Sequence, residues 1–266
     1  KNYNSMKTIK TLNGVSLSID ESGQGTPVVL VHGLSSSKEV MFPIRDMLQD
    51  SFQCICYDTR GHGESEKLSH YTLTDHANDL VAVIREYGAG KPVDVIGFSM
   101  GSYIATAAAA QVPELVNHLI LIGTKGDGKT SSVERIFREK GKDPNEASEI
   151  AKLLTLMGAT FAPKTHFWTK LKMAKLQSPV KLTKEDKVAE TEALHDFNNF
   201  SLMPKITAKT LVVVGQFDGI NPPELGKAVA SAIPNAEYKE VPDTAHMLFI
   251  EKPEIVAPIL RDWLNK

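Results

Sequence analysis

The chain has 266 residues, 42% of them hydrophobic and 23% charged, with a formal net charge of −2. This composition is typical of a globular protein with a substantial core and excludes a disordered or fibrous chain. We expect no nucleic-acid partner, because the net charge is close to zero. We also expect no integral membrane association, because the longest apolar run, Leu80–Ile84, is far shorter than the roughly 20 residues of a membrane span.

The amino-terminal residues predict a β-hairpin. Lys7–Leu12 and Val15–Asp20 alternate polar and apolar residues, and Asn13-Gly14 between them favours a two-residue turn.

The rest of the chain alternates between continuously apolar runs, typical of strands buried on both faces, and amphipathic helical patterns. The predicted strands are Val28–Val31, Phe52–Tyr57, Val93–Phe98, Leu119–Ile122, Leu211–Val214 and Ala236–Val241. The predicted helices are Lys38–Gln49, Thr74–Tyr87, Met100–Gln111, Pro222–Ile233 and Pro253–Asn265. This alternation predicts an α/β fold, in which a mostly parallel, doubly wound sheet has helices on both faces and is preceded by the antiparallel hairpin.

Residues 126–203 interrupt the alternation, because they contain no strand-like run. Helix-compatible pieces fill this stretch instead: Ser131–Lys140, Asn145–Met157, His166–Gln177 and Lys184–Asn198. We interpret residues 126–203 as a helical cap inserted into a core made of residues 1–125 and 204–266. The lysines of this cap are interspersed with Glu and Asp, a pattern typical of a solvent-exposed face.

The two cysteines, Cys54 and Cys56, are two residues apart in an apolar stretch. Residues at that spacing on a strand are badly placed to form a disulfide with each other, and no further metal ligands are spaced for a site nearby. We therefore expect two buried, reduced thiols, no metal site and a cytoplasmic protein. The chain begins with Lys1 rather than Met, which leaves room for a preceding segment that was removed.

The pentapeptide Gly97-Phe98-Ser99-Met100-Gly101 has the form G-x-S-x-G. It follows one predicted strand and opens the next predicted helix, which is the setting of a nucleophile elbow. The sharp turn holds the serine in strained backbone geometry, and the flanking glycines leave room for neighbouring backbone. The alternative is a glycine-rich turn in which Ser99 only caps the helix.

A serine hydroxyl needs a base to act as a nucleophile, and the base needs an acid to orient it. In the elbow architecture the acid and then the histidine follow the serine along the chain. Asp218 comes soon after the predicted strand Leu211–Val214, and His246 is the only histidine beyond it. The carboxyl ends of parallel strands share one edge of a sheet, so we expect Ser99, Asp218 and His246 to meet there. Asp127 is the rival acid, and the alternatives are that Asp218 caps a turn and that His246 is an ordinary loop histidine.

Attack on an acyl carbon creates an oxyanion, which fixed hydrogen-bond donors must stabilise. The backbone N–H of Met100 is one candidate, because it follows Ser99 at the start of a helix. The second should come from the loop after the first buried strand, where the N–H of Leu34 is the expected donor. We interpret His32 and His62 as residues that organise their glycine-containing loops rather than as bases.

Five motifs occur in order along the chain: His32-Gly33, Asp58–Ser65, Gly97–Gly101, Gly215–Asp218 and Asp243–His246. Together they resemble the α/β-hydrolase superfamily, and most closely its small capped esterases, lactonases, C–C bond hydrolases and cofactor-free haloperoxidases. The resemblance implies a Ser99–Asp218–His246 triad with oxyanion donors from Leu34 and Met100. Serine at position 99 argues against haloalkane dehalogenases and epoxide hydrolases, which use aspartate, and dienelactone hydrolases, which use cysteine.

These residues predict hydrolysis of a carboxylic ester or a related small acyl substrate through an acyl-enzyme, without a cofactor. One alternative is a ligand receptor or signalling module that retains the triad and acts through a partner. Another is C–C bond cleavage or peracid formation at the same residues. The apolar residues predicted to line the substrate pocket are Met157, Phe161, Phe167 and Trp168, although packing between cap and core is the other interpretation of residues at this spacing.

Overall fold

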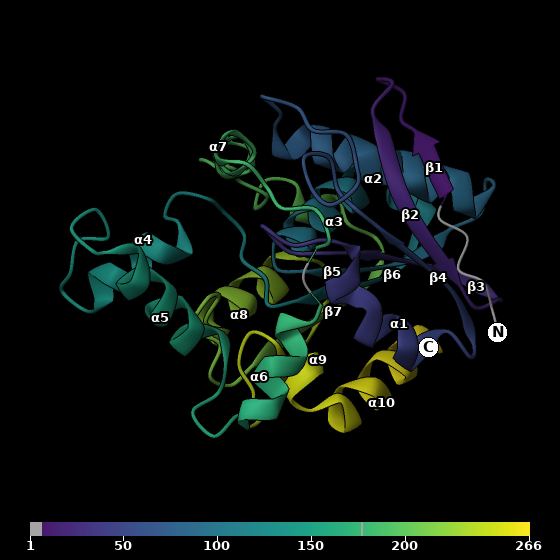
Figure 1. Cartoon of the computed structure of the whole chain (residues 1–266). Helices are drawn as coiled ribbons and strands as arrows, with labels where there is room; N and C mark the ends of the chain where they lie inside the picture. Colours follow the sequence, from purple (N-terminus) through teal and green to yellow (C-terminus); the bar gives the residue numbers. More distant parts are fainter. Residues whose placement is uncertain (1–6, 177) are drawn as a thin grey trace.

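The computed structural model of the protein describes residues 7–176 and 178–266, and its eight-stranded sheet has the order β1-β2-β4-β3-β5-β6-β7-β8. The strands are β1 Lys7–Lys10, β2 Ser16–Ser22, β3 Thr26–Val31, β4 Phe52–Tyr57, β5 Val93–Phe98, β6 Val116–Ile122, β7 Lys209–Gly215 and β8 Glu237–Val241. Strand β2 pairs antiparallel with β1 and with β4, and the other neighbouring strands are parallel. The predicted mostly parallel sheet with an amino-terminal hairpin is therefore confirmed (Figure 1).

The turn of the hairpin is longer than predicted. Pairing between β1 and β2 ends at Lys10 and Ser16, which leaves residues 11–15 as the loop. The favoured two-residue turn needs a positive φ at both central residues, and here Gly14 has φ 79° whereas Asn13 does not have a positive φ. The prediction of a two-residue turn was wrong because strand pairing stops before the Asn-Gly pair.

Helices cover both faces of the sheet. Those of the core are α1 Phe42–Leu48, α2 Leu73–Gly88, α3 Met100–Gln111, α8 Pro223–Ala232, α9 Leu248–Glu251 and α10 Pro253–Leu264, with short 3₁₀ helices at Lys38–Met41, Pro113–Leu115 and Met203–Lys205. Alternate side chains of β3 divide between the two faces. Val29 and Val31 belong to the core cluster that includes residues of α2, α3 and α8, and Val28 and Leu30 to the cluster that includes residues of α1, α9 and α10. The predicted Lys38–Gln49 helix is a 3₁₀ turn followed by α1, and α9 was not predicted. In the described part of the chain, no helix is long and apolar enough to span a membrane.

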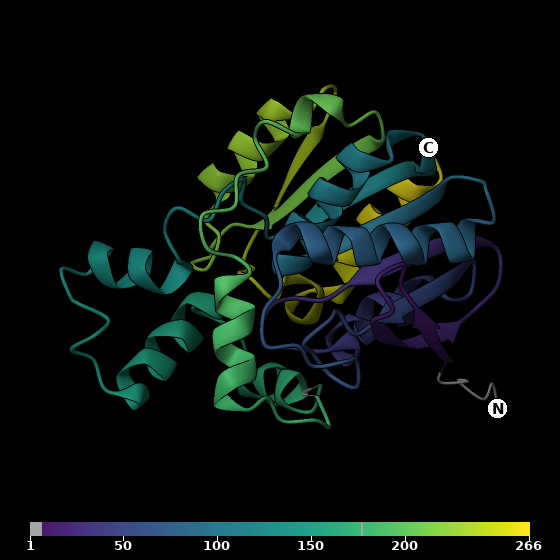
Figure 2. The same ribbon diagram turned by 90° about the horizontal axis from the view of Figure 1, so that it is seen from above.

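The segment between β6 and β7 is a helical insertion. Its helices are α4 Ser132–Glu139, α5 Glu149–Thr160, α6 Phe167–Ala174 and α7 Lys184–Glu192. Helices α4 and α5 project away from the sheet in both ribbon views (Figures 1 and 2). Two predicted boundaries were wrong: α5 starts after its N-cap Ser148 rather than at Asn145, and α7 ends well before Asn198. The predicted helix end at Gln177 lies outside the described residues, and the division into cap and core stays a prediction.

The two cysteines lie on β4, and both are buried and free, as predicted. Burial raises the pKa of the Cys54 thiol to about 12 and raises that of Cys56 well above its ordinary value. Both thiols therefore stay protonated at neutral pH, which leaves them a packing role.

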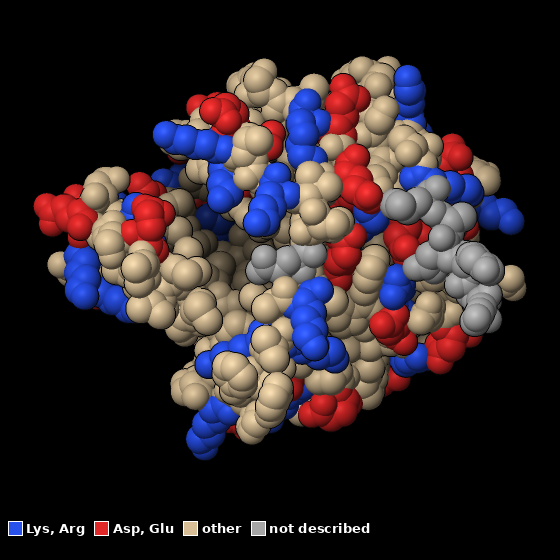
Figure 3. Space-filling model, viewed as in Figure 1, with Lys and Arg blue, Asp and Glu red and all other residues tan. Residues whose placement is uncertain are grey.

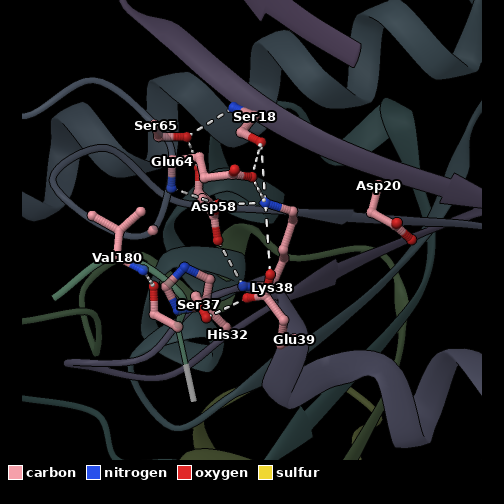
Figure 4. A network of polar contacts seen from close by, with 12 residues as sticks. Ser18, Asp20, His32, Ser37, Lys38, Glu39, Asp58, Glu64, Ser65 and Val180 are labelled. Atoms are coloured by element: carbon pink, nitrogen blue, oxygen red, sulfur yellow. Dashed lines mark hydrogen bonds and ion pairs between the residues drawn. The ribbon is translucent and has the colours of Figure 1, made fainter. Parts of the chain in front are cut away.

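A buried lysine contacts both β2 and the loop that follows β4. Lys38 is 3% exposed, and its Nζ lies 2.8 Å from Oδ2 of Asp58 and 2.7 Å from Oε2 of Glu64 (Figure 4). Its Nζ also donates to Oγ of Ser18 over 3.1 Å, and its backbone N–H donates to Oδ1 of Asp58 over 2.7 Å. Burial alone would lower the pKa of Lys38, but the hydrogen bonds to Asp58 and Glu64 outweigh it and raise the pKa.

Replacing Lys38 with methionine is expected to lower the free energy of unfolding by about 3 kcal/mol, because it leaves the fully buried carboxylate of Asp58 without its cation. Urea denaturation of the variant measures this loss. Lys91→Met, at an exposed position, is the matched control and should change stability little. A loss below about 1 kcal/mol for Lys38→Met would show that the pair behaves like an exposed ion pair instead.

Candidate active site

The serine of the G-x-S-x-G motif lies at the turn between β5 and α3. Ser99 has φ 52° and ψ −121°, a region that non-glycine residues adopt at a cost of about 1–3 kcal/mol. Its backbone N–H donates to the carbonyl of Ile122 over 2.9 Å, which holds the turn against β6. A Cβ at Gly97 would overlap the carbonyl of Gly101, and one at Gly101 would overlap the carbonyl of Val31. The two glycines are therefore required by the close approach of α3 to β3 and β5.

Asp218 and His246 form a buried pair at the same edge of the sheet. Nδ1 of His246 lies 2.8 Å from Oδ2 of Asp218, and the two residues are 6% and 2% exposed. The other carboxylate oxygen of Asp218 accepts hydrogen bonds from the backbone N–H of Ile220 over 2.9 Å and of Asn221 over 2.8 Å. Because an ionised carboxylate can only accept, Nδ1 carries the proton in this contact, and Nε2 of His246 carries the lone pair of the ring.

Ser99 lies next to this pair, but its hydroxyl is not hydrogen-bonded to His246 among the described residues. The ring of Phe98 lies 4.9 Å from that of His246, measured between centroids. Gly123 follows the strand that holds the Ser99 amide, and a Cβ there would lie 3.0 Å from the His246 ring. The structure thus brings the three predicted residues to one edge, with the serine–histidine contact still open.

A tyrosine on α3 contributes to the polar surroundings of Ser99. Tyr103 is one helical turn beyond it, and its own hydroxyl accepts a hydrogen bond from Nδ2 of Asn221 over 2.7 Å. Burial raises the pKa of Tyr103, while the hydrogen bonds with Asn221 and Ser99 act in the opposite direction. Nδ2 of Asn221 also donates to the carbonyl of Gly123 over 2.6 Å. Sequence reasoning missed Tyr103 and Asn221, although the helical spacing of Tyr103 from Ser99 is a signal that would have found the first.

The loop after β3 lies against the elbow. A Cβ at Gly33 would come within 3.2 Å of Cβ of Ser99, so the following peptide is close to the serine. Nδ1 of His32 donates to the carbonyl of Gly33 over 2.8 Å, and Nε2 of His32 accepts from the backbone N–H of Thr59 over 3.0 Å. His32 therefore organises this loop. The N–H of Met100 is at the first position of α3, where a helix amide has no partner within the helix.

The pKa of His32 predicts a pH dependence of stability. Burial, followed by the charge of His62, lowers this pKa to about 3. The unfolded chain takes up a proton at His32 near pH 6.5, whereas the folded protein resists it. The stabilisation is thus complete above about pH 6.5 and is lost as the pH falls towards about 3, at up to about 1.4 kcal/mol per pH unit.

Urea denaturation at several pH values between about 6.5 and 4 measures this slope. His76 contributes in the same direction, because burial also lowers its pKa. The His32→Gln variant isolates the effect of His32, and its stability should depend less steeply on pH than that of the parent. Equal slopes would show that His32 binds its proton equally in both states.

The rival acid lies elsewhere. Asp127 forms an isolated β-bridge with Asn198, and its Oδ1 accepts from the backbone N–H of Lys129 over 3.2 Å. Asp127 also lines a cavity of about 370 Å³ near α4 and α8. The acid that the structure places beside His246 is Asp218.

The insertion residues expected to line the substrate pocket fall into two groups. Phe167 and Trp168 are each 67% exposed, with ring centroids 5.7 Å apart, and Met157 is 44% exposed. Phe161 is 4% exposed and packs in the same core cluster as Phe98. This environment agrees with the alternative interpretation, in which the residue packs between cap and core. Contact of these four side chains with substrate stays a prediction.

The surface is hollowed between the lobe of α4 and α5 and the rest of the molecule (Figure 3). A cavity of about 430 Å³ lies between these helices and the turn that follows Asp218, and its lining includes Arg135, Ala159 and Gly219. Charges of both signs are interspersed on the face that Figure 3 shows.

The family assignment rests on a match over most of the chain. The sequence model of the alpha/beta hydrolase fold family matches residues 26–253. The chain belongs to this family. This α/β-hydrolase is 28% identical to the putative non-heme bromoperoxidase BpoC of Mycobacterium tuberculosis over 261 residues, 91% of this chain and 95% of that protein. It is 29% identical to the proline iminopeptidase PfmaB of Pestalotiopsis fici, over 96% of this chain and 98% of that protein.

Solved structures show the same likeness. A thermophilic esterase from Thermogutta terrifontis is similar to this α/β-hydrolase with a TM-score of 0.81 and 28% sequence identity, over 98% of each chain. The enol-lactonase from Burkholderia xenovorans has a TM-score of 0.83 at 22% identity, over 98% of this chain and all of that one. At such identities the second likeness shows the fold alone.

Proposed function

We propose that this α/β-hydrolase is a serine hydrolase that cleaves a carboxylic ester or a related small acyl substrate. The observation that supports the proposal most is the buried Asp218–His246 pair, with 2.8 Å between Oδ2 and Nδ1, beside a strained serine on an elbow. Ser99 is the nucleophile, His246 the general base and Asp218 the acid that orients it.

The reaction begins when Nε2 of His246 takes the proton of the Ser99 hydroxyl and Oγ attacks the substrate carbonyl. The open Ser99–His246 contact has to close for this step, and such contacts are often long in a free enzyme and tighten around the substrate. His246 then protonates the leaving alcohol, and water hydrolyses the acyl-enzyme through the same base. Asp218 stays ionised and stabilises the imidazolium.

The tetrahedral intermediate carries a negative charge on the former carbonyl oxygen. The N–H groups of Leu34 and Met100 are the proposed donors, because one belongs to the loop against Ser99 and the other begins α3. Loss of one such donor typically costs about 3 kcal/mol in the transition state.

Hydrolysis of a p-nitrophenyl ester series, from acetate to long-chain esters, tests the proposal. We expect saturable turnover of at least one short-chain ester and a rate that depends on acyl-chain length along the series. A folded protein that turns over none of these esters but binds a ligand and, with it, a partner would instead support a receptor.

A second candidate, peracid formation, is favoured by the similarity to the putative bromoperoxidase. In this reaction hydrogen peroxide replaces water and accepts the acyl group from Ser99, which yields a peracid and the free serine. A peracid assay with an acetyl ester and peroxide distinguishes the two, since peracid release faster than hydrolysis would favour this second function.

A further inference from the structure

One carboxylate of the insertion is directed into the core. Glu190 on α7 is 2% exposed, whereas Glu192, two residues further on, is exposed at the end of the same helix. Glu190 is therefore not part of the solvent-exposed face that the interspersed lysines of this segment predict. A buried carboxylate is strongly disfavoured unless its oxygens are hydrogen-bonded. The partners of Glu190 therefore explain why this side chain is buried.

Those partners lie in the loops after β3 and β4. Oε2 of Glu190 accepts the backbone N–H of Ser35 over 3.0 Å, and Oε1 accepts the Ser35 hydroxyl. Nε2 of His62 lies 2.8 Å from Oε2, within ion-pair distance. Helix α7 is seated by Ala189 and Ala193, which pack with Tyr71. Glu190 thus reaches from the insertion to two loops of the core.

Ser35 needs these contacts to keep its conformation. Its φ is 53°, in the left-handed region that a serine adopts only when its surroundings fix it. Ser35 directly follows Leu34, the proposed oxyanion donor. On the other side of Leu34, His32 holds the carbonyl of Gly33. A trans peptide directs the Leu34 N–H opposite to that carbonyl, so the donor is fixed from both sides.

We propose that Glu190 is a positioning residue that holds the oxyanion loop from the insertion, so that seating of α7 completes the oxyanion hole. This inference rests on the proposed function, because an oxyanion hole stabilises an oxyanion that forms only during acyl transfer. Glu190 does not touch the reacting atoms. It acts through Ser35, whose amide and hydroxyl it fixes beside the donor.

Kinetics of Glu190→Ala test the inference, with Glu192→Ala as the matched control on the same helix. We expect kcat to fall about 10- to 100-fold with little change in KM, because displaced donors weaken transition-state binding most. A trifluoromethyl ketone, whose carbonyl adds the Ser99 hydroxyl and forms an oxyanion, should lose affinity by the same factor. A methyl ketone of the same shape should bind as before, and Glu192→Ala should match the parent.

Two milder variants cover the case in which Glu190→Ala does not fold. Glu190→Gln keeps the size of the side chain and one acceptor oxygen, and Ser35→Ala removes only the hydroxyl contact. Each is expected to lose about fivefold in kcat, with the same loss for the trifluoromethyl ketone. Folded variants with parental kcat would overturn the inference, and so would a loss of kcat that the trifluoromethyl ketone does not share.

Hydrogen exchange at the Ser35 amide separates this inference from the proposed function, because it does not depend on turnover. Exchange should be faster in Glu190→Ala than in the parent and unchanged in Glu192→Ala. Unchanged exchange in Glu190→Ala would contradict the positioning role even in an active hydrolase. If Glu190→Ala exchanges faster but the parent protein has no esterase activity, the contact between Glu190 and Ser35 is supported and the proposed function is rejected.

Discussion

Replacing Ser99 with alanine is expected to lower kcat for ester hydrolysis by on the order of 10⁵-fold, because no other group in the site can form the acyl-enzyme. Alanine has the same difficulty as serine with a φ of 52°, so the fold should remain. Steady-state kinetics with p-nitrophenyl butyrate measure the loss, and circular dichroism checks the fold.

Ser201→Ala, at an exposed position before β7, is the matched control and should retain parental kcat. Residual activity of Ser99→Ala above about 1% of the parent would mean that another nucleophile, or water activated directly by His246, carries the reaction.

Replacing Asp218 with asparagine is expected to lower kcat by about 10⁴-fold. The carboxylate accepts the Nδ1 proton of His246, whereas an amide can donate to Nδ1 and so favours the tautomer whose Nε2 carries the proton. The base would then be blocked although its position is unchanged. The loss should appear in kcat with little change in KM.

Asp127→Asn is the matched control, since Asp127 was the rival acid and lines a cavity whose lining includes neither Asp218 nor His246. It should hydrolyse esters at the parental rate. The opposite pattern, in which Asp127→Asn is inactive and Asp218→Asn is active, would assign the acid to Asp127.

The parts of the fold that sequence reasoning predicted well are those with strong local signals. The strand Val93–Phe98 and the helix Met100–Gln111 have the predicted bounds, because Gly97 and Gly101 leave a single place for the turn between them. The chain order of acid and histidine likewise led to the residues that form the Asp218–His246 pair.

The parts that it missed depend on contacts between distant segments. Glu190 lies in a highly charged helix, where nothing in the local pattern distinguishes a buried carboxylate from its exposed neighbours. The link between Tyr103 and Asn221 joins α3 to the loop between β7 and α8, a contact that only the folded sheet brings about. The bounds of α5 were missed because Ser148, its N-cap, was not recognised.

The exposed aromatic residues of α6 show a similar limit. A helical pattern reveals that Phe167 and Trp168 are apolar residues on a short helix, but it does not say whether a substrate or the core covers them. Both side chains are largely exposed, and they contact each other. The pocket is thus the part of the site that the sequence defined least.

Trapping the acyl group most directly tests whether Ser99, His246 and Asp218 act together. Protein quenched during turnover of p-nitrophenyl acetate, then digested and analysed by mass spectrometry, should carry one acetyl group on the peptide of Ser99. In His246→Ala, the amount of this acetylated peptide should be no higher than the background measured in Ser99→Ala. Acetylation of a different residue, or turnover by the parent with Ser99 never acetylated under any quench time, would contradict the account.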